Sequence, residues 1–211
     1  MVRTGARVAA LQELLRQDGL RESAGKPAAP RLSKFPPDAS AAIVDLYRQL
    51  GGSLEDPSLK PGSWDLAYEG GLLIELDEDF HFNRYRTVTL TAPFAANLPW
   101  ADAYRRYSID HENGGNGGKR WTNNSAKRLF GGADPAGVFE NYGAPRWKQR
   151  ALYDAMKDAA AAHGLATLAR LSIHDPIGRV TLGDVLYGRA IAKPGSLRDL
   201  LESRIAQSGP C

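Results

Sequence analysis

The sequence has almost no cysteine and no long apolar run. Its single cysteine, Cys211, excludes a disulfide within the chain and a cysteine-based zinc site. No segment approaches the roughly 18 consecutive apolar residues that a membrane span requires. The N-terminal residues also lack the continuous apolar stretch of a secretory signal. We therefore expect a cytoplasmic protein in a reducing compartment, with no membrane contact.

Neither sign of charge dominates the whole chain, but the charge is unevenly distributed. The 27 Lys and Arg residues and 24 Asp and Glu residues give a net charge of +3. Residues 1–116 hold 13 basic and 16 acidic residues, and residues 117–211 hold 14 and 8, so the two parts carry −3 and +6. An acidic cluster beside a basic half suits a metal-dependent enzyme that acts on a polyanion. Ordinary surface variation gives the same imbalance.

Hydrophobic periodicity divides the 211 residues into one main domain with extensions. Residues 6–17 have the spacing of a helix, and the proline-rich segment 23–38 follows as a linker, so residues 1–38 precede a main domain at 39–211. Within it the patterns predict helices at 39–50, 146–162 and 196–206, a strand or extension at 85–90, and a buried strand at 165–173. Residues 91–145 are expected to form a long, irregular, basic insertion. The mixture predicts an α/β fold.

Acidic residues follow the most apolar strand of the sequence. The run Leu72–Ile74 leads into Glu75 and Asp77, which strand alternation places on one face. The turn residues Gly70–Gly71 can bring Asp65 beside them in a hairpin. Buried carboxylates require a cation, and an all-oxygen ligand set suits Mg²⁺ or Mn²⁺ better than zinc. This segment therefore predicts a three-carboxylate metal site.

The order of these elements resembles the PD-(D/E)XK, or restriction-endonuclease-like, nuclease superfamily. That core has a helix, a hairpin with Asp and then (D/E)-x-K, a helix and a strand, and the chain offers helix 39–50, Asp65, Glu75-Leu76-Asp77, helix 146–162 and strand 165–173. The segment from Glu75 to His81 is similar to the E-x-D-G-x-x-H pattern of the branch related to very-short-patch-repair endonucleases. Gln149 and Tyr153 are similar to the Q-x-x-x-Y pattern of RecB-like members. The resemblance implies a mixed β-sheet flanked by helices, with helical extensions at both ends.

The resemblance also implies an activity and a set of site residues. The chain would be a Mg²⁺- or Mn²⁺-dependent DNA endonuclease of a restriction, defence or repair type, with metal held by Asp65, Glu75, the backbone carbonyl of Leu76, and Asp77. Asp77 stands where the superfamily has lysine, so either it is an extra ligand or another group, His81, Arg84 or Lys148, steadies the phosphate. Nucleic-acid contacts are expected from Lys119, Arg120, Lys127, Arg128, Arg146, Gln149, Arg150 and Tyr153.

Other interpretations stay open at the level of sequence. Glu75 and Asp77 can form a solvated strand edge in salt bridges with Arg84 and Arg86, while Asp65 caps a turn. The segment Asp110-His111, followed by asparagines, superficially resembles an HNH nuclease, but it lacks the later histidine.

The missing lysine also suits a nucleic-acid-binding module without catalysis, and a third alternative is an interaction protein with no nucleic-acid role. Cutting both DNA strands normally needs two active sites, so double-strand cleavage would fit a symmetric homodimer. A monomer could nick one strand.

Overall fold

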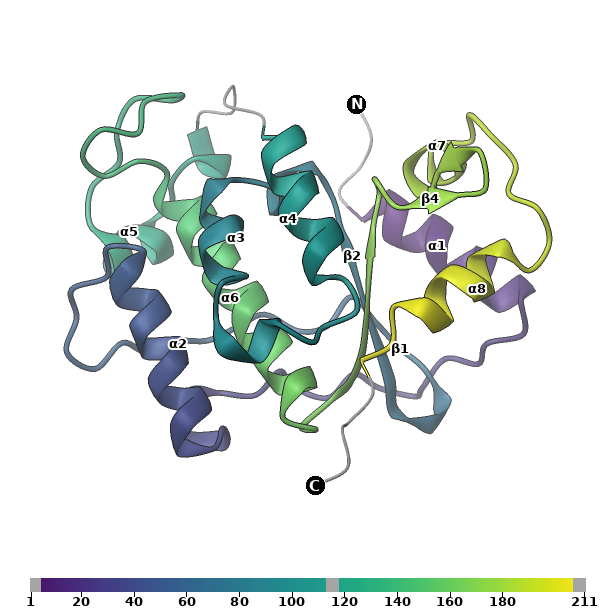
Figure 1. The fold of residues 1–211 in the computed structure, drawn as a ribbon, viewed down its shortest axis with the longest axis horizontal. Coiled ribbons are helices and arrows are strands. Elements are labelled where there is room, and N and C mark those ends of the chain that lie inside the picture. The colour runs from purple at the N-terminus through teal and green to yellow at the C-terminus, as the bar shows by residue number, and fades with distance from the viewer. Residues whose placement is uncertain (1–4, 113–117, 207–211) are drawn as a thin grey trace.

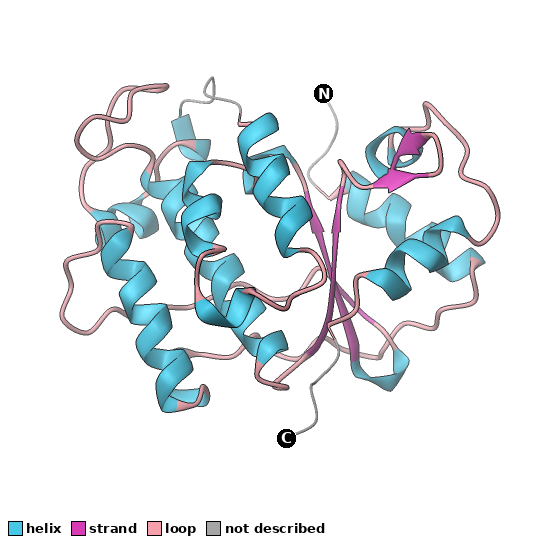
Figure 2. Ribbon diagram, viewed as in Figure 1, coloured by secondary structure: helices cyan, strands magenta, loops and turns pink. Residues whose placement is uncertain are grey.

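A three-stranded sheet lies between two layers of helices in the computed structural model, which describes residues 5–112 and 118–206 (Figures 1 and 2). Its strands are β1 (Leu66–Ala67), β2 (Leu72–Asp77) and β3 (Thr167–Ser172), in the order β1-β2-β3. β4 (Pro176–Ile177) and β5 (Val180–Thr181) form a separate antiparallel pair. The α-helices are α1 (Ala6–Gln17), α2 (Pro37–Gln49), α3 (Arg84–Thr89), α4 (Ala101–Asp110), α5 (Asn124–Phe130), α6 (Pro145–Ala162), α7 (Leu182–Leu186) and α8 (Ser196–Ser203).

The sheet is mixed. β1 and β2 form an antiparallel hairpin, and β2 pairs with β3 in parallel, with Glu75 opposite Arg170 and Asp77 opposite Ser172. The long connection from β2 to β3 passes through α6, as a parallel pair requires. The general α/β class is therefore confirmed. The carboxyl ends of β2 and β3 meet at one edge of the sheet, where ligands commonly bind in open α/β folds.

The two faces of the sheet belong to two apolar cores. On one face, Leu73 and Leu168 pack in a cluster with α2, α3, α4 and α6. On the other, Ile74 and Leu171 pack in a cluster with α1, α7 and α8. Figure 1 shows these two groups of helices on opposite sides of the strands. The terminal helices, expected as extensions, thus form the second layer of the same domain.

The prediction of a strand or extension at 85–90 is wrong, because this segment is α3. The side chain of Asn83 accepts hydrogen bonds from the backbone N–H groups of Tyr85 and Arg86 and so caps the helix. That capping outweighs the β-propensity of the residues that follow.

The prediction of an irregular insertion at 91–145 is also wrong. The segment contains α4 and α5, and its Trp100 and Tyr104 are 0% exposed in the larger core cluster. The glycine-rich stretch 113–117 lies outside the described residues. Helix α1 has the predicted bounds, 6–17. No helix in the described ranges is long and apolar enough to cross a bilayer.

Candidate metal centre

The face of the sheet toward α6 carries buried charged side chains. Alternation along β2 directs Glu75 and Asp77 to this face, and their register with β3 places Arg170 beside them. Exposure of these three residues is 3%, 1% and 0%. Helix α6 supplies the facing groups Asp154, Lys157 and Asp158, which are also buried. Charges buried to this degree must be paired or bind an ion. The predicted alternative of a solvated strand edge is therefore wrong.

Asp77, His81 and Asp154 converge at the carboxyl end of β2. The short 3₁₀ helix η3 (Asp79–His81) follows the strand and brings His81 Nδ1 to 2.9 Å from Asp77 Oδ1 and 2.8 Å from Asp154 Oδ2. One possible ligand atom from each of these residues lies within 4.8 Å of the others, so the group can hold a metal ion. Asp77 Oδ1 is buried, and His81 Nδ1 is its close charged neighbour at 2.9 Å. The side chain of His81 is 23% exposed, whereas those of Asp77 and Asp154 are buried.

Two buried arginines pair with the aspartates around this group: Arg170 contacts Asp77, and both Arg170 and Arg86 contact Asp158. Arg170 Nη1 lies 2.5 Å from Asp77 Oδ2, the oxygen that does not face His81, and Arg170 Nε lies 2.8 Å from Asp158 Oδ1. Arg86 Nη2 lies 2.7 Å from the second oxygen of Asp158. Ion pairs of this kind orient a carboxylate, as groups around metal ligands commonly do. The arrangement leaves Asp77 Oδ1 directed toward His81.

Protonation of His81 balances the charge of this network. Burial alone would lower the pKa of His81, but the carboxylates of Asp154 and Asp77 outweigh it and raise the pKa to about 9. Burial would likewise raise the pKa of Asp77, but Arg170 and His81 hold it well below its ordinary value. With His81 protonated, three aspartates face three cations. A metal ion at Nδ1 must therefore displace a proton, because only neutral imidazole binds metal.

The β1–β2 hairpin brings Asp65 beside Glu75, but these two residues do not form the predicted metal-binding group with Asp77: in the described residues that group is Asp77, His81 and Asp154, and Glu75 pairs with Lys157 instead. The backbone N–H of Asp65 donates to Glu75 Oε1 over 3.1 Å, and the N–H of Leu76 donates to Asp65 Oδ2 over 3.0 Å. Lys157 Nζ lies 2.7 Å from Glu75 Oε2 and also donates to the carbonyl of Ser63. Burial raises the pKa of Glu75 to about 7, although Lys157 opposes the shift. This second cluster lies directly beside Asp77 along β2.

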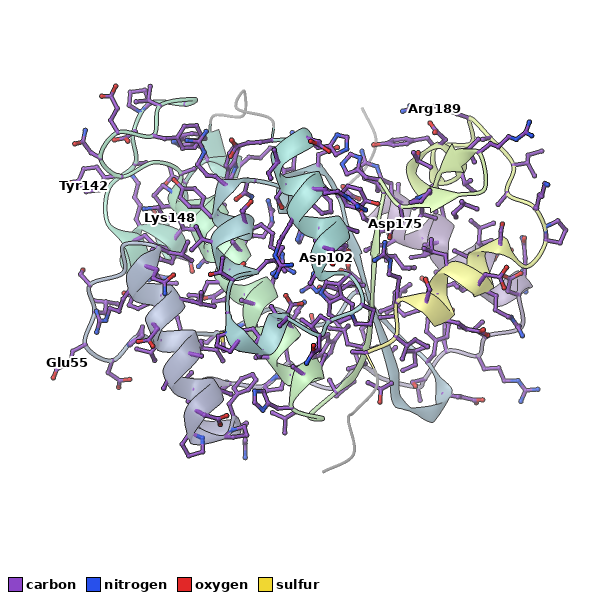
Figure 3. The ribbon with its side chains drawn as sticks, in the orientation of Figure 1. Glu55, Asp102, Tyr142, Lys148, Asp175 and Arg189 are labelled. Carbon is purple, nitrogen blue, oxygen red and sulfur yellow. The ribbon has the colours of Figure 1, made fainter. Side chains whose placement is uncertain are left out.

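Two predicted catalytic residues lie elsewhere, so the prediction that Arg84 or Lys148 replaces the superfamily lysine is wrong. Arg84 Nη2 lies 2.8 Å from Glu112 Oε2, and the guanidinium stacks on Phe139. Lys148 Nζ lies 5.4 Å from the centre of the Tyr85 ring, and Figure 3 shows it among the helices away from the sheet. It precedes Lys157 by two and a half helical turns, on the opposite side of α6.

Lys157, Asp154 and Asp158 were not predicted from the sequence as site residues. All three lie in the long helix 146–162, where a charged set at spacings of three and four interrupts an alanine-rich stretch. That spacing places them on one helix face. Sequence alone did not show that this face is the buried one. Leu76, predicted to offer its carbonyl to metal, instead contributes the N–H that Asp65 accepts.

The predicted nucleic-acid contacts lie in α5, α6 and the short 3₁₀ helix at 118–120. A hollow of about 670 Å³ contains four of them, and an adjoining hollow of about 730 Å³ contains two more. The first is lined by Arg128, Arg146, Gln149 and Tyr153, together with Lys60, and the second by Lys119 and Lys127, with Arg128 shared between them. Gln149 is 2% exposed and donates to Ser125 Oγ over 2.8 Å. The two remaining contacts, Arg120 and Arg150, lie at the ring of Phe80.

The HNH-like segment gives no metal group within residues 5–112 and 118–206. The ring of His111 stacks on that of His174, with centroids 3.7 Å apart. Asn123 uses its side chain to cap α5 by accepting from the N–H of Ala126. These residues therefore pack and cap rather than form a ββα metal site.

Comparisons with known proteins give a family and no named relative. No curated protein and no solved structure matches the chain. Residues 45–188 match the model of the family of unknown function DUF7255. The match covers 188 − 45 + 1 = 144 of the 211 residues, including β1, β2, α6 and β3 with both clusters of charged residues. The chain therefore belongs to the family of unknown function DUF7255.

Proposed function

We propose that this protein is a metal-dependent endonuclease that hydrolyses DNA phosphodiester bonds, with a restriction-endonuclease-like fold. The observation that carries the proposal is the convergence of Asp77, His81 and Asp154 at the carboxyl end of β2, where the His81 side chain is partly exposed. The order of helix, hairpin, helix and parallel strand supports the same fold. Perturbed titratable groups gathered at one sheet edge are typical of functional sites.

The donor set fits a hard divalent cation. Two carboxylates and one imidazole suit Mn²⁺ or Mg²⁺, and the imidazole favours Mn²⁺ of the two. Asp77 Oδ1 faces His81 Nδ1 at 2.9 Å, and loss of the His81 proton would leave both atoms as ligands for the ion. A bound ion of this kind lowers the pKa of a water and stabilises charge on a phosphoryl oxygen. Arg170 keeps Asp77 oriented whether or not the ion is bound.

The second cluster supplies proton-transfer groups in this proposal. Lys157 provides, from a helix, the cation that the superfamily carries on the strand. Glu75, with its pKa near 7, can gain or lose a proton at neutral pH, which is the property that general acid–base catalysis needs. Asp65 is half-buried and lies between the Glu75–Lys157 pair and the protein surface. Its backbone hydrogen bond fixes one oxygen of Glu75 in place.

The basic hollows along α6 and α5 favour a polyanionic substrate. Lysine and arginine side chains that line a concave surface bind phosphates through charge and release of counterions. The hollow of about 670 Å³ includes Gly62, one residue before Ser63, whose carbonyl accepts from Lys157. A DNA strand bound in this hollow would therefore lie close to the Glu75–Lys157 pair.

A second candidate function is DNA binding without catalysis. The observation that favours it is the charge balance of the network, since Arg86, Arg170 and protonated His81 compensate Asp77, Asp154 and Asp158 with no metal. In this alternative the network would stabilise the fold only. The basic hollows would still bind nucleic acid.

A cleavage and binding assay tests the proposal. Supercoiled plasmid and labelled single- and double-stranded oligonucleotides are incubated with Mg²⁺ or Mn²⁺ and the wild-type, Asp77→Asn, Asp154→Asn or Asp175→Asn protein. Asp175 is the matched control, because it is fully buried and paired with Arg204 but lies outside the metal group. Cleavage by the wild type and the control alone supports the endonuclease. Binding without cleavage supports the second candidate, and no DNA binding at low salt rejects both.

A further inference from the structure

Two guanidinium groups lie against one aromatic ring next to His81. The ring of Phe80, in η3, has the Cζ atom of Arg120 at 4.7 Å from its centre and that of Arg150 at 5.7 Å. Arg150 Nη1 also donates to the carbonyl of Phe80 over 3.1 Å. The two arginines come from distant parts of the chain, the insertion and α6. Both are therefore held at the Phe80 ring, directly beside His81 in the sequence.

Neither arginine has a carboxylate partner in the ranges that the structure describes. Nearby arginines do, since Arg7 pairs with Glu78 and Arg84 with Glu112. Arg150 is only half-exposed, and its burial, with the neighbouring charge of Arg146, lowers the pKa of Arg150. The carboxylates of Asp154, Asp77 and Glu78 act on Arg150 without pairing directly with it, so this partly desolvated cation keeps unsatisfied N–H donors. A pair of such cations at one point makes a local site for an anion.

The geometry points to a phosphate-binding clamp formed by Arg120 and Arg150 beside Asp77, His81 and Asp154. Its place at the cleaved phosphodiester rests on the proposed function. Guanidinium groups bind phosphate oxygens through two parallel N–H donors. Contact with an aromatic face leaves those N–H edges free and restricts the side chain. A phosphate at this point would supply the direct ion-pair partner that both guanidinium groups lack in the described ranges.

The clamp gives the insertion a role in substrate binding. Arg120 ends the short helix η5 (Gly118–Arg120), which packs against α6. Trp121, directly after it, is buried against Trp147 of α6, with ring centres 5.1 Å apart. This packing fixes the position of Arg120 relative to Arg150. The segment that the sequence marks as an insertion therefore completes the site.

Binding measurements without cleavage test the clamp. Wild-type, Arg120→Gln, Arg150→Gln and Arg179→Gln proteins are titrated in EDTA with a short fluorescein-labelled DNA strand, and inorganic phosphate is added as a competitor. Arg179 is the control, because it is exposed in the turn between β4 and β5, and Figure 1 shows β4 on the opposite side of the sheet from α6. Each clamp variant should bind about 10-fold more weakly, with the salt slope reduced by about one. The control should match the wild type.

Unchanged affinity and salt slope in both clamp variants would overturn the inference, and Arg120→Gln, at an exposed position, keeps the test valid if Arg150→Gln misfolds. The outcome is separate from that of the proposed function. Loss of binding in the clamp variants of a protein that cleaves no substrate supports the clamp and rejects the endonuclease. Cleavage by the wild type, with both variants binding and cleaving equally well, rejects the clamp alone.

Discussion

Lys157 Nζ lies 2.7 Å from Glu75 Oε2, across 82 positions of sequence, and both side chains are more than nine-tenths buried. The pair joins α6 to β2 and lies next to the Asp77–His81–Asp154 group. Each charge depends on the other, because a buried ion without its partner is strongly destabilising. Glu75 has one alternative, which is to accept a proton.

Replacing Lys157 should therefore destabilise the protein in a pH-dependent way. Lys157→Met should reduce the free energy of unfolding by about 3 kcal/mol at pH 8. The loss should shrink toward pH 5, because Glu75 is then neutral in the folded protein and needs no cation. The double variant Glu75→Gln/Lys157→Met should recover part of the loss at pH 8. Urea unfolding at the two pH values measures this. Additive losses in the double variant would show that the pair is not coupled.

His81 should make the metal-free protein less stable as the pH rises. Its pKa is raised from 6.5 to about 9, so the protonated ring stabilises the fold below pH 6.5, and this contribution is lost between pH 6.5 and 9. The shift corresponds to about 3 kcal/mol at most. His81→Asn should abolish this part of the pH dependence, and His163→Asn, at the far end of α6, should retain it. Unfolding in EDTA across this range gives the comparison. A wild-type profile as flat as that of His81→Asn would contradict the assigned ion pairs.

Arg170 should be far more important to stability than Arg84. Arg170→Met removes the cation that contacts Asp77, Asp154 and Asp158, and it should cost about 3–5 kcal/mol of unfolding free energy. Arg84→Gln breaks a half-exposed pair with Glu112 and should change stability by less than about 1 kcal/mol. Chemical denaturation of both variants decides this. Similar small losses would mean that the buried network contributes little.

Divalent metal should stabilise the protein, and more so at higher pH. Binding at His81 Nδ1 releases a proton, so the stabilisation by Mn²⁺ should increase from pH 6.5 to 8.5. EDTA should reverse the effect. Thermal unfolding with and without Mn²⁺ provides the measurement, and the Asp154→Asn protein should show no such increase. An equal shift in that variant would place the metal elsewhere.

Sequence patterns were sufficient to predict elements that have strong hydrophobic periodicity or clear turn residues. The amphipathic helix α1 and the apolar strand ending in Glu75 and Asp77 were predictable, because local residues decide them. The hairpin that brings Asp65 to Glu75 was predictable from Gly70–Gly71, both of which have positive φ. Helix α3 was not, because one capping side chain overrode the propensity of six residues.

The composition of the site depended on tertiary contacts that sequence does not show. His81 and Asp77 are four residues apart, but their partner Asp154 lies on a helix whose buried face is set by packing against the sheet. Lys157 and Lys148 are equivalent in type, and only the rotation of α6 decides which of them meets Glu75. Whether a carboxylate of the site binds a metal ion or pairs with a basic side chain likewise depends on its neighbours in the folded protein.

The proposed function depends on a divalent ion held by Asp77, His81 and Asp154, and direct titration measures whether the protein binds one. Isothermal calorimetry with Mn²⁺ at pH 8 is applied to the wild-type, Asp154→Asn and Asp175→Asn proteins. We predict one ion per chain for the wild type and for Asp175→Asn, and an affinity at least about 100-fold lower for Asp154→Asn. Absence of Mn²⁺ binding by the folded wild type, or equal binding by Asp154→Asn, would contradict the claim.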